Sequence, residues 1–344
     1  MGTPKDILFS DKNRYNHYRM SLKLQHQYID DFLRDVISEY PTYGPTQERT
    51  AIVSKFRFKK LSKSSDLSLN YGPTVIPPKK YLLPAREIIL RFDGDEIFPP
   101  DNKDSVIFGL NKKDAEGIFY LDKLMSSPMT EEHYQKRREK IHLVVIDNFP
   151  PSNNLDCDLY LQRVSETEYL VFSFSEFGSR LLKKKYFDRK AVTGSILTRH
   201  MPDEIIHHPL LDEIVEQSAD HPIWKRLAKE CFTCGICSFT CPLCYCFEVE
   251  DKIDIKTHMD KKLRGTRERR WDSCMLPEFN KVTFHNFRPE PKDRIYNWYY
   301  HKFVRMPREY GFPGCIECGR CIEFCPANIN FREVLKELID DYRK

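Results

Sequence analysis

The sequence predicts an α+β protein, in which a mixed α/β N-terminal domain is followed by a mainly helical second domain. Several runs in the first half have the apolar pattern of strands, whereas apolar residues recur at helical spacing near the start and in the last third. Cysteines gather in two short runs near the C-terminal end. The 344 residues suffice for two domains, which we place at 1–215 and 216–344, the second with a long insert at 247–314.

The composition narrows the class of protein. Hydrophobic residues make up 40% and charged residues 31% of the chain, as in soluble globular proteins. The net charge of +4 is too small to indicate nucleic-acid binding. We see no secretory signal, and no apolar run approaches the roughly 18 residues that a membrane span needs. We therefore expect a cytoplasmic protein without membrane contact, in which clustered cysteines indicate metal binding rather than disulfides.

The first domain begins with an amphipathic helix within 13–40 that ends before Pro41. The Ser/Lys-rich stretch 59–68 is typical of a surface loop. Strands are predicted by the patterns at 52–58, 87–92, 105–110, 141–146, 159–164 and 169–174. No G-x-G-x-x-G and no P-loop occurs in the sequence. We interpret this domain as a docking scaffold rather than a nucleotide site.

The second domain opens with a helix at 220–230, directly before the first cysteine run. That run, residues 231–247, reads CFTCGICSFTCPLCYCF, and a second run at 315–326 reads CIECGRCIEFCP. Both contain C-x2-C-x2-C-x3-C followed by proline, which is the ligand spacing of a two-cluster bacterial ferredoxin. A last helix follows Asn330, which can cap it. Helices beside both runs favour a helical ferredoxin-like domain over the compact ββ type.

In that ligand pattern, the first three cysteines of each run bind one [4Fe–4S] cluster and the fourth binds the other cluster. The predicted ligands of the first cluster are Cys231, Cys234, Cys237 and Cys325. The predicted ligands of the second cluster are Cys315, Cys318, Cys321 and Cys241. Gly235 and Gly319 lie beside ligands, where they permit tight turns. Structural zinc is the alternative, but it normally uses two cysteine pairs rather than two such quartets.

Of the four cysteines outside this pattern, three lie near the two runs: Cys244, Cys246 and Cys274. One interpretation is a third iron–sulfur site, with Cys157 or Asp272 as its fourth ligand. The other is that these are buried thiols that pack around the first cluster and exclude water. The spacing alone leaves both open.

The run KKLRGTRERR at 261–270 contains six basic residues and one acid. We interpret it as a solvated loop in the insert. The alternative is a docking patch for an acidic partner surface. Binding of nucleic acid is a weaker third interpretation, because the run lacks interleaved aromatic residues.

Several motifs together resemble those of a known protein family. They are HPIWKRLAKECFTCGICSFTCPLCYCF (221–247), RRWDSCMLPEF (269–279), HNFRP (285–289), HKFV (301–304) and CIECGRCIEFCP (315–326), with PPKKYLLPAREIILRF (77–92) and VIFGLNKKDAEGI (106–118) in the first half. This combination resembles the β (iron–sulfur) subunits of soluble [NiFe] hydrogenases and sulfhydrogenases. The related iron–sulfur subunit of anaerobic sulfite reductase shares much of it.

The resemblance implies a subunit that passes electrons between a hydrogenase module, with its small and large subunits, and a flavin- and NAD(P)-binding subunit. No catalytic residue is expected in this chain. The chain departs from the family at Lys113, where relatives often have cysteine, and it keeps only Cys157 where they often have several. The alternatives are an electron-transfer subunit of an anaerobic sulfite reductase-like complex and, in a different class, a zinc-stabilised nucleic-acid-binding module.

Overall fold

The structure, a computed structural model, describes residues 20–49, 54–94, 96–98, 103–183, 185–188, 203–254 and 263–344. The chain divides into two compact units. The first takes Met1–Tyr71, Asp104–Phe119 and Ile141–Arg199, and the second takes Gly72–Lys103, Tyr120–Lys140 and His200–Lys344. The expected domains, 1–215 and 216–344, stay a prediction, since these units divide the chain at other points.

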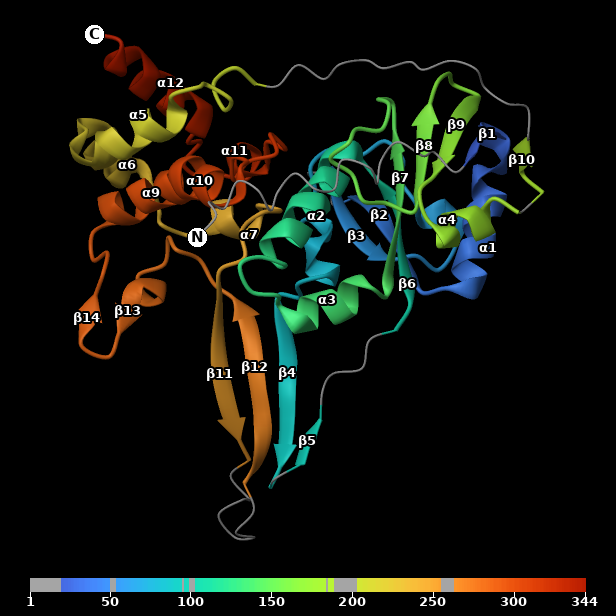
Figure 1. The fold of residues 1–344 in the computed structure, drawn as a ribbon, viewed down its shortest axis with the longest axis horizontal. Coiled ribbons are helices and arrows are strands. Elements are labelled where there is room, and N and C mark those ends of the chain that lie inside the picture. The colour runs from blue at the N-terminus through green and yellow to red at the C-terminus, as the bar shows by residue number, and fades with distance from the viewer. Residues whose placement is uncertain are drawn as a thin grey trace, which may run out of the picture. The chain divides into compact units, whose positions relative to one another are not determined.

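The first unit is built on an eight-stranded mixed sheet with the order β10-β1-β9-β8-β7-β6-β2-β3 (Figure 1). Strands β2, β6, β7 and β8 are parallel, and the other neighbours are antiparallel. The strands are β1 (Met20–Gln25), β2 (Thr42–Arg49), β3 (Ser54–Lys60), β6 (Ser105–Leu110), β7 (Ile141–Asp147), β8 (Leu159–Arg163), β9 (Glu168–Ser173) and β10 (Phe187–Asp188). The central strands read as continuous apolar runs because they are buried.

Helix α1 (Ile29–Glu39) packs its apolar face into the core of this sheet. Phe32, Leu33 and Val36 are fully buried beside residues of β1, β6 and β9. The predicted helix within 13–40, ending before Pro41, is therefore confirmed for its described part. The other helical elements here are η2 (His26–Tyr28), η3 (Ser64–Asp66), α4 (Glu176–Leu181) and α2 (Lys112–Leu124), which continues into the second unit.

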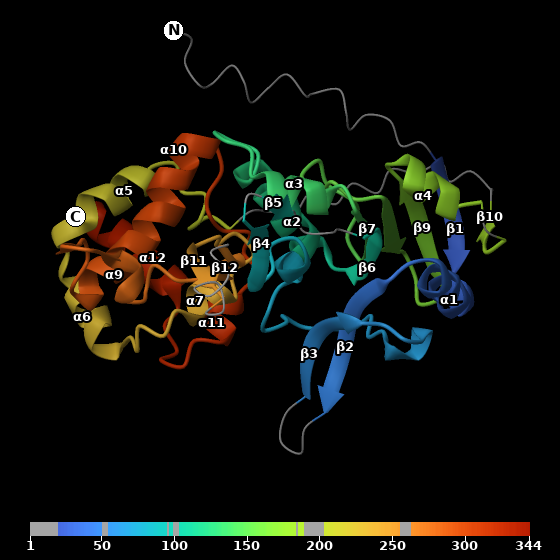
Figure 2. The same cartoon turned by 90° about the horizontal axis from the view of Figure 1, so that it is seen from below.

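Most predicted strands are confirmed within one or two residues, with residues 52 and 53 lying outside the described part. Several details of the first unit differ, and strands β2 and β10 were not predicted. Strand β1 was not predicted, because its short alternating pattern directly precedes a strongly amphipathic helix. The stretch 59–68 is not all loop, since β3 extends to Lys60 and pairs with β2 in a hairpin that Figure 2 shows clearly.

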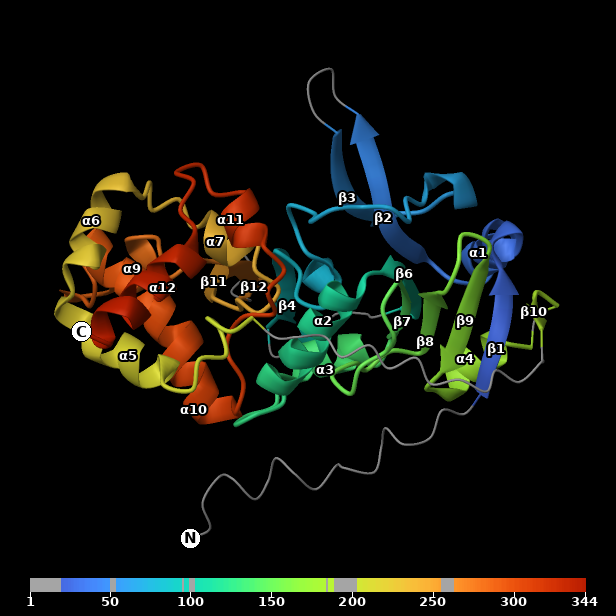
Figure 3. The ribbon, with the colours of Figure 1, turned by 90° about the horizontal axis from the view of Figure 1, so that it is seen from above.

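The second unit combines an antiparallel sheet, β11-β12-β4-β5, with a group of helices that Figure 3 shows together. The strands are β4 (Arg86–Asp93), β5 (Glu96–Phe98), β11 (Phe247–Ile253) and β12 (Arg264–Trp271), with a small pair β13 (Lys281–Val282) and β14 (His285–Asn286). The helices are η4 (Pro78–Tyr81), α3 (Glu132–Arg138), α5 (Leu211–Gln217), η5 (Ser218–Asp220), α6 (Pro222–Glu230), α7 (Ile236–Phe239), η6 (Glu278–Asn280), α9 (Pro291–Tyr300), η7 (His301–Arg305), α10 (Met306–Tyr310), α11 (Arg320–Glu323) and α12 (Phe331–Tyr342). Helices and sheets together confirm the α+β class, while the mainly helical character of the ferredoxin-like part stays a prediction.

The interpretation of 261–270 as a solvated loop is wrong for the residues that the structure describes. Arg264–Trp271 is strand β12, paired on both sides with β11 and β4. Its arginines are held by acidic side chains of this unit: Arg267 bonds Asp251 at 2.7 Å, and Arg269, only 3% exposed, bonds Glu87 at 2.8 Å. Cross-strand charge pairs therefore stabilise this strand, although its many charged residues are more typical of a loop. Lys261 and Lys262 lie outside the described residues.

The helical core of the second unit contains Trp224, Leu227 and Trp298, together with Leu335 and Leu338 of the last helix. The predicted helices at 220–230 and after Asn330 are confirmed as α6 and α12, and the Asn330 side chain accepts the backbone N–H of Arg332 at 3.1 Å. None of the helices in the described part of the chain has the length and apolarity that a bilayer crossing needs.

Candidate metal centre

The two cysteine runs adopt the same backbone conformation. Thr233 and Glu317, two residues after the first cysteine of each run, have positive φ values of 49° and 58°. Gly235 and Gly319 follow with φ of 76° and 74°. These left-handed residues curl each run so that successive cysteines point to one place. Each run then enters a four-residue helix, α7 or α11.

Backbone N–H groups are directed at the thiols. Thr233 N donates to Cys231 Sγ and Glu317 N donates to Cys315 Sγ, both at 3.3 Å. Ile329 N donates to Cys325 Sγ at 3.4 Å. The bonds to Cys231 and Cys315 favour the deprotonated sulfur, which is the form that ligates a metal.

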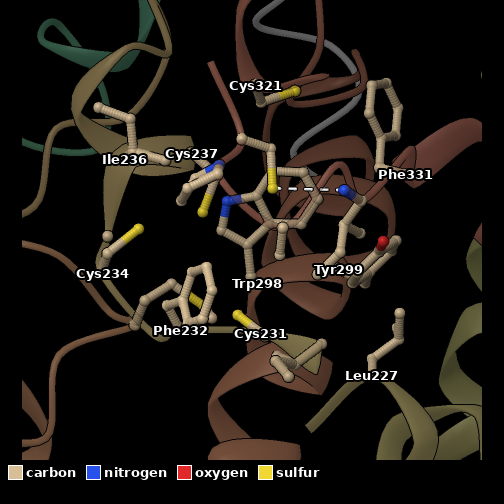
Figure 4. A pocket seen from close by; sticks show the side chains of 17 residues that line it. Leu227, Cys231, Phe232, Cys234, Ile236, Cys237, Trp298, Tyr299, Cys321 and Phe331 are labelled. Atoms are coloured by element: carbon tan, nitrogen blue, oxygen red, sulfur yellow. Dashed lines mark hydrogen bonds between the residues drawn. The ribbon is translucent and has the colours of Figure 1, made fainter. Parts of the chain in front are cut away.

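A cavity gathers the thiols assigned to the first cluster (Figure 4). It is lined by Cys231, Cys234 and Cys237 from the first run and by Cys325, the last cysteine of the second run, with Cys321 also at its wall. Its other walls are mostly apolar: Leu227, Phe232, Ile236, Met275, Ile295, Trp298, Tyr299, Ile329 and Phe331. Phe232 is 67% exposed and Cys234 is exposed, so one side of this group meets solvent.

Cys241, the last cysteine of the first run, lies with the second run instead. Burial raises the pKa of Cys321, and the thiolates of Cys315 and Cys241 raise it further. Burial likewise raises the pKa of Cys318, where the charge of Cys241 also acts. Cys325 thus shares a cavity with the first three cysteines of the other run, and Cys241 lies close enough to Cys315, Cys318 and Cys321 for its charge to act on them.

A buried lysine contacts Cys241 directly. Lys302 is 4% exposed, and its Nζ lies 3.2 Å from Cys241 Sγ and 2.7 Å from the carbonyl oxygen of Gly314. Burial opposes its charge, but the thiolates of Cys241, Cys244 and Cys315 together raise the pKa of Lys302 well above its usual value. Lys302 belongs to η7, a π-helical segment between α9 and α10. π-helical turns of this kind are frequent at functional sites.

Two further buried cations lie around the second set of cysteines. Lys79, 2% exposed, donates from Nζ to the carbonyl oxygens of Cys241 at 2.7 Å and Cys244 at 2.5 Å. Burial lowers the pKa of Lys79 from its usual value, while the negative charges of Cys244 and Cys241 act to raise it. Arg320, also 2% exposed, donates from Nε to the carbonyl oxygen of Thr74 at 2.9 Å, and its charge lowers the pKa of Cys318 against the larger effect of burial. The surroundings of this set are therefore cationic, whereas those of the first set are mostly apolar.

The donor set fits an iron–sulfur group. All eight predicted ligands are thiols, the soft donors that such clusters take. Burial raises the pKa of Cys237 and of Cys315 to about 12, so these thiols need positive charge nearby to ionise. Within the described residues, no three His, Cys, Asp or Glu side chains are grouped as around a single metal ion. A cube of four irons does not require such convergence, because each cysteine ligates a different iron.

Comparison with known proteins agrees with this donor set. Residues 230–329 match a family model described as a 4Fe-4S dicluster domain. Over 339 residues the chain is 30% identical to sulfhydrogenase 2 subunit beta of Pyrococcus furiosus, in a match that covers 92% of this chain and 98% of that protein. This chain belongs to the sulfhydrogenase β-subunit family. No solved structure gave a significant match.

Cys244, Cys246 and Cys274, which lie outside the two quartets, each have another thiol as a hydrogen-bond partner. The Cys244 thiol hydrogen-bonds Cys241, and together with the charges of Lys302 and Lys79 it holds the pKa of Cys241 well below its ordinary value despite burial. The Cys274 thiol hydrogen-bonds Cys246, which is the main reason why the pKa of Cys246 is lowered to about 7. The third iron–sulfur site stays a prediction.

The two proposed fourth ligands of that third site have different surroundings. Asp272 donates its backbone N–H to the carbonyl oxygen of Cys246 at 2.9 Å, while its carboxylate accepts the N–H of Ser273 at 2.7 Å. Cys157 is buried in the first unit. Lys113, which stands where relatives often have cysteine, lies 3.8 Å from the carboxylate of Glu116.

Sequence reasoning missed the three buried cations. Lys79, Lys302 and Arg320 all lie inside the motifs that carry the family resemblance, yet lysine and arginine are usually exposed. A weak signal existed for Lys302, since it stands between apolar residues of the helical pattern Trp298–Phe303–Val304. That position faces the core, and a lysine on a core-facing position needs an anionic partner.

Proposed function

We propose that this chain is an electron-transfer subunit that carries two [4Fe–4S] clusters. It relays electrons in the cytoplasm between a hydrogenase module, with small and large subunits, and a flavin- and NAD(P)-binding subunit. The name of the Pyrococcus relative, a sulfhydrogenase β subunit, favours this assembly over a sulfite reductase-like one.

One observation carries the proposal. Cys325 lines the same cavity as Cys231, Cys234 and Cys237, although Cys325 and Cys237 are 88 positions apart in the sequence. This supports crossed ligation, in which Cys231, Cys234, Cys237 and Cys325 hold the first cluster and Cys315, Cys318, Cys321 and Cys241 hold the second. Crossed ligands keep two clusters close together, as electron hopping requires.

The protein's own contribution is to bind and surround the clusters. A [4Fe–4S] cluster supplies one-electron redox chemistry when it is bound. The backbone N–H groups of Thr233 and Glu317 support the ligating sulfurs, and the wall formed by Trp298, Tyr299 and Phe331 excludes water from one side of the first site. No acid–base group is needed for this function.

Metal analysis of the full-length chain, prepared without oxygen, tests the proposal. We expect about eight iron and eight sulfide per chain in brown protein. About four iron in fully loaded protein, or zinc in colourless protein, would contradict two clusters. Co-purification of the native complex then identifies the partners, since a hydrogenase module brings nickel with it.

A further inference from the structure

Two lysines of the second unit are buried without a carboxylate. Within the described part of the chain, the hydrogen-bond partners of Lys302 Nζ are Cys241 Sγ and the Gly314 carbonyl, and those of Lys79 Nζ are the carbonyls of Cys241 and Cys244. Aromatic rings cover both ammonium groups: Trp298 lies 5.1 Å from Lys302 Nζ and Trp271 lies 4.3 Å from Lys79 Nζ. Burying an ammonium group is costly unless an anion lies close to it.

The second set of ligands provides that anion. Four thiolates outweigh the positive charge of an iron–sulfur cube, so the ligated cluster is an anion and gains one more negative charge on reduction. Cys241 is the ligand that both lysines approach, one at its sulfur and the other at its carbonyl oxygen. A nearby fixed cation in a low-dielectric interior stabilises the reduced cluster more than the oxidised cluster.

We propose that Lys302 and Lys79 form a charge-compensating pair that raises the reduction potential of the second cluster. This inference rests on the proposed function, because it requires a cluster on Cys315, Cys318, Cys321 and Cys241. It assigns to the two lysines a role that the cysteine ligands cannot perform, which is to set how readily this cluster accepts an electron.

The effect is directed at the second cluster. The cation whose charge reaches Cys231 is Arg294, and its guanidinium is already bonded to the backbone carbonyls of Met275, Arg288 and Pro289 at 2.7–3.0 Å. The charge of Lys302 also acts on Cys237, but within the described residues the cysteine sulfur at hydrogen-bond distance from Lys302 Nζ is that of Cys241. Loss of the lysine charge should therefore move the second potential more than the first.

The backbone is built to bring Lys302 to this place. In the π-helical segment, the N–H of Met306 bonds the carbonyl oxygen of His301, five residues back. Gly314 N donates to the Lys302 carbonyl at 2.7 Å while Lys302 Nζ donates to the Gly314 carbonyl at 2.7 Å. A Cβ at Gly314 would lie 2.9 Å from Lys302 Cα, so only glycine permits this approach next to Cys315.

The test is a redox titration of the full-length, anaerobically prepared chain, followed by electron paramagnetic resonance. Lys302→Met and Lys79→Met remove one buried charge each with little change in side-chain length. Lys225→Met removes one positive charge from a solvent-exposed position of α6, where water screens the charge, and is the matched control. Cys318→Ala shows which of the two midpoints belongs to the second cluster.

We expect Lys302→Met to lower the second midpoint by at least a tenfold change in the reduction equilibrium, which is about 59 mV for one electron. Lys79→Met should lower it in the same direction, and Lys225→Met should leave it unchanged. Unchanged midpoints in both buried variants, with about eight iron present, would overturn this inference while leaving the two-cluster proposal intact. A wild-type chain without two clusters would instead overturn the proposed function.

If the methionine variants lose the second cluster, no midpoint can be measured for it. Lys302→Arg, which keeps the positive charge, then tests whether charge or side-chain shape is required at this position. Retention of the cluster in Lys302→Arg would support the inference, because it would show that the charge itself is required. Loss of the cluster in Lys302→Arg as well would overturn it, since shape rather than charge would then be what the position supplies.

Discussion

The two cysteine runs have the same spacing and nearly the same backbone, but their surroundings differ. Around the first set, the walls are mostly aromatic and aliphatic, and Cys234 is exposed. Around the second set, Lys79, Lys302 and Arg320 are buried. The comparison teaches that a ligand motif specifies where thiols go, whereas residues that the spacing does not specify, two of them (Lys79 and Lys302) outside the run, decide the electrostatic environment in which they act.

The largest expected effect comes from replacing the two crossing cysteines. Cys241→Ala and Cys325→Ala should each lose about four iron per chain, because each removes one ligand of one cube. If ligation is crossed, Cys241→Ala loses the same paramagnetic signal as Cys318→Ala, and Cys325→Ala loses the same signal as Cys234→Ala. The opposite matching, with Cys241→Ala resembling Cys234→Ala, would show that each run binds its own cluster.

A second prediction uses the difference in solvent access. Phe232 and Cys234 are exposed beside the first set of cysteines. In the second set, the buried side chains of Lys302 and Lys79 contact Cys241. Slow exposure of the loaded protein to oxygen, or to an iron chelator, should therefore release iron in two phases. We expect the first phase to take about four iron and to remove the signal of the first cluster. Equal release rates, or earlier loss of the second cluster, would contradict the difference in access.

The sequence predicted the local features of these sites well. Cysteine spacing identifies eight candidate ligands because cluster ligation depends on residues a few positions apart. Helix α12 and its cap at Asn330 follow from periodicity and from one side-chain bond. The strands β6 and β7 follow from continuous apolar runs. Each of these patterns depends on a short stretch of chain.

The rest depends on partners that are far apart in the sequence. Strand β12 was predicted as a loop because its arginines look solvated until Glu87, Asp93 and Asp251 are placed beside them. Lys302 reaches Cys241 only because a π-helical turn and Gly314 bring it there, and neither has a recognisable spacing pattern. Long-range charge pairing therefore limits what a single sequence predicts in this protein.

A third prediction compares equivalent glycines of the two runs. Both Gly235 and Gly319 have positive φ, so alanine at either position costs about 1–2 kcal/mol of backbone strain. At Gly235, a Cβ would also lie 2.9 Å from Ser273 and 3.0 Å from Phe239, whereas at Gly319 it would meet nothing within 4 Å. We therefore expect Gly235→Ala to lose about 2–4 kcal/mol of unfolding free energy and Gly319→Ala about 1–2 kcal/mol.

Chemical unfolding of the cluster-loaded variants under nitrogen measures both losses of unfolding free energy. The midpoint of Gly235→Ala should be the lower of the two, with similar denaturant dependence in both variants. Equal losses would mean that Ser273 moves aside without cost. A larger loss in Gly319→Ala would mean that the tight packing at the first run is not what distinguishes the two loops.

The smallest expected effect concerns Cys274, a thiol outside both quartets. Its sulfur pairs with Cys246 and lies 3.9 Å from the Ser238 hydroxyl, and serine could make similar hydrogen bonds. If the thiols pack around the first cluster, Cys274→Ser should keep about eight iron per chain and both signals. If Cys244, Cys246 and Cys274 instead hold a third cluster, the wild type should contain about twelve iron and the variant about four fewer. We expect the first result, because Cys246 and Cys274 already satisfy each other by a hydrogen bond. A drop of about four iron confined to a third signal would contradict it.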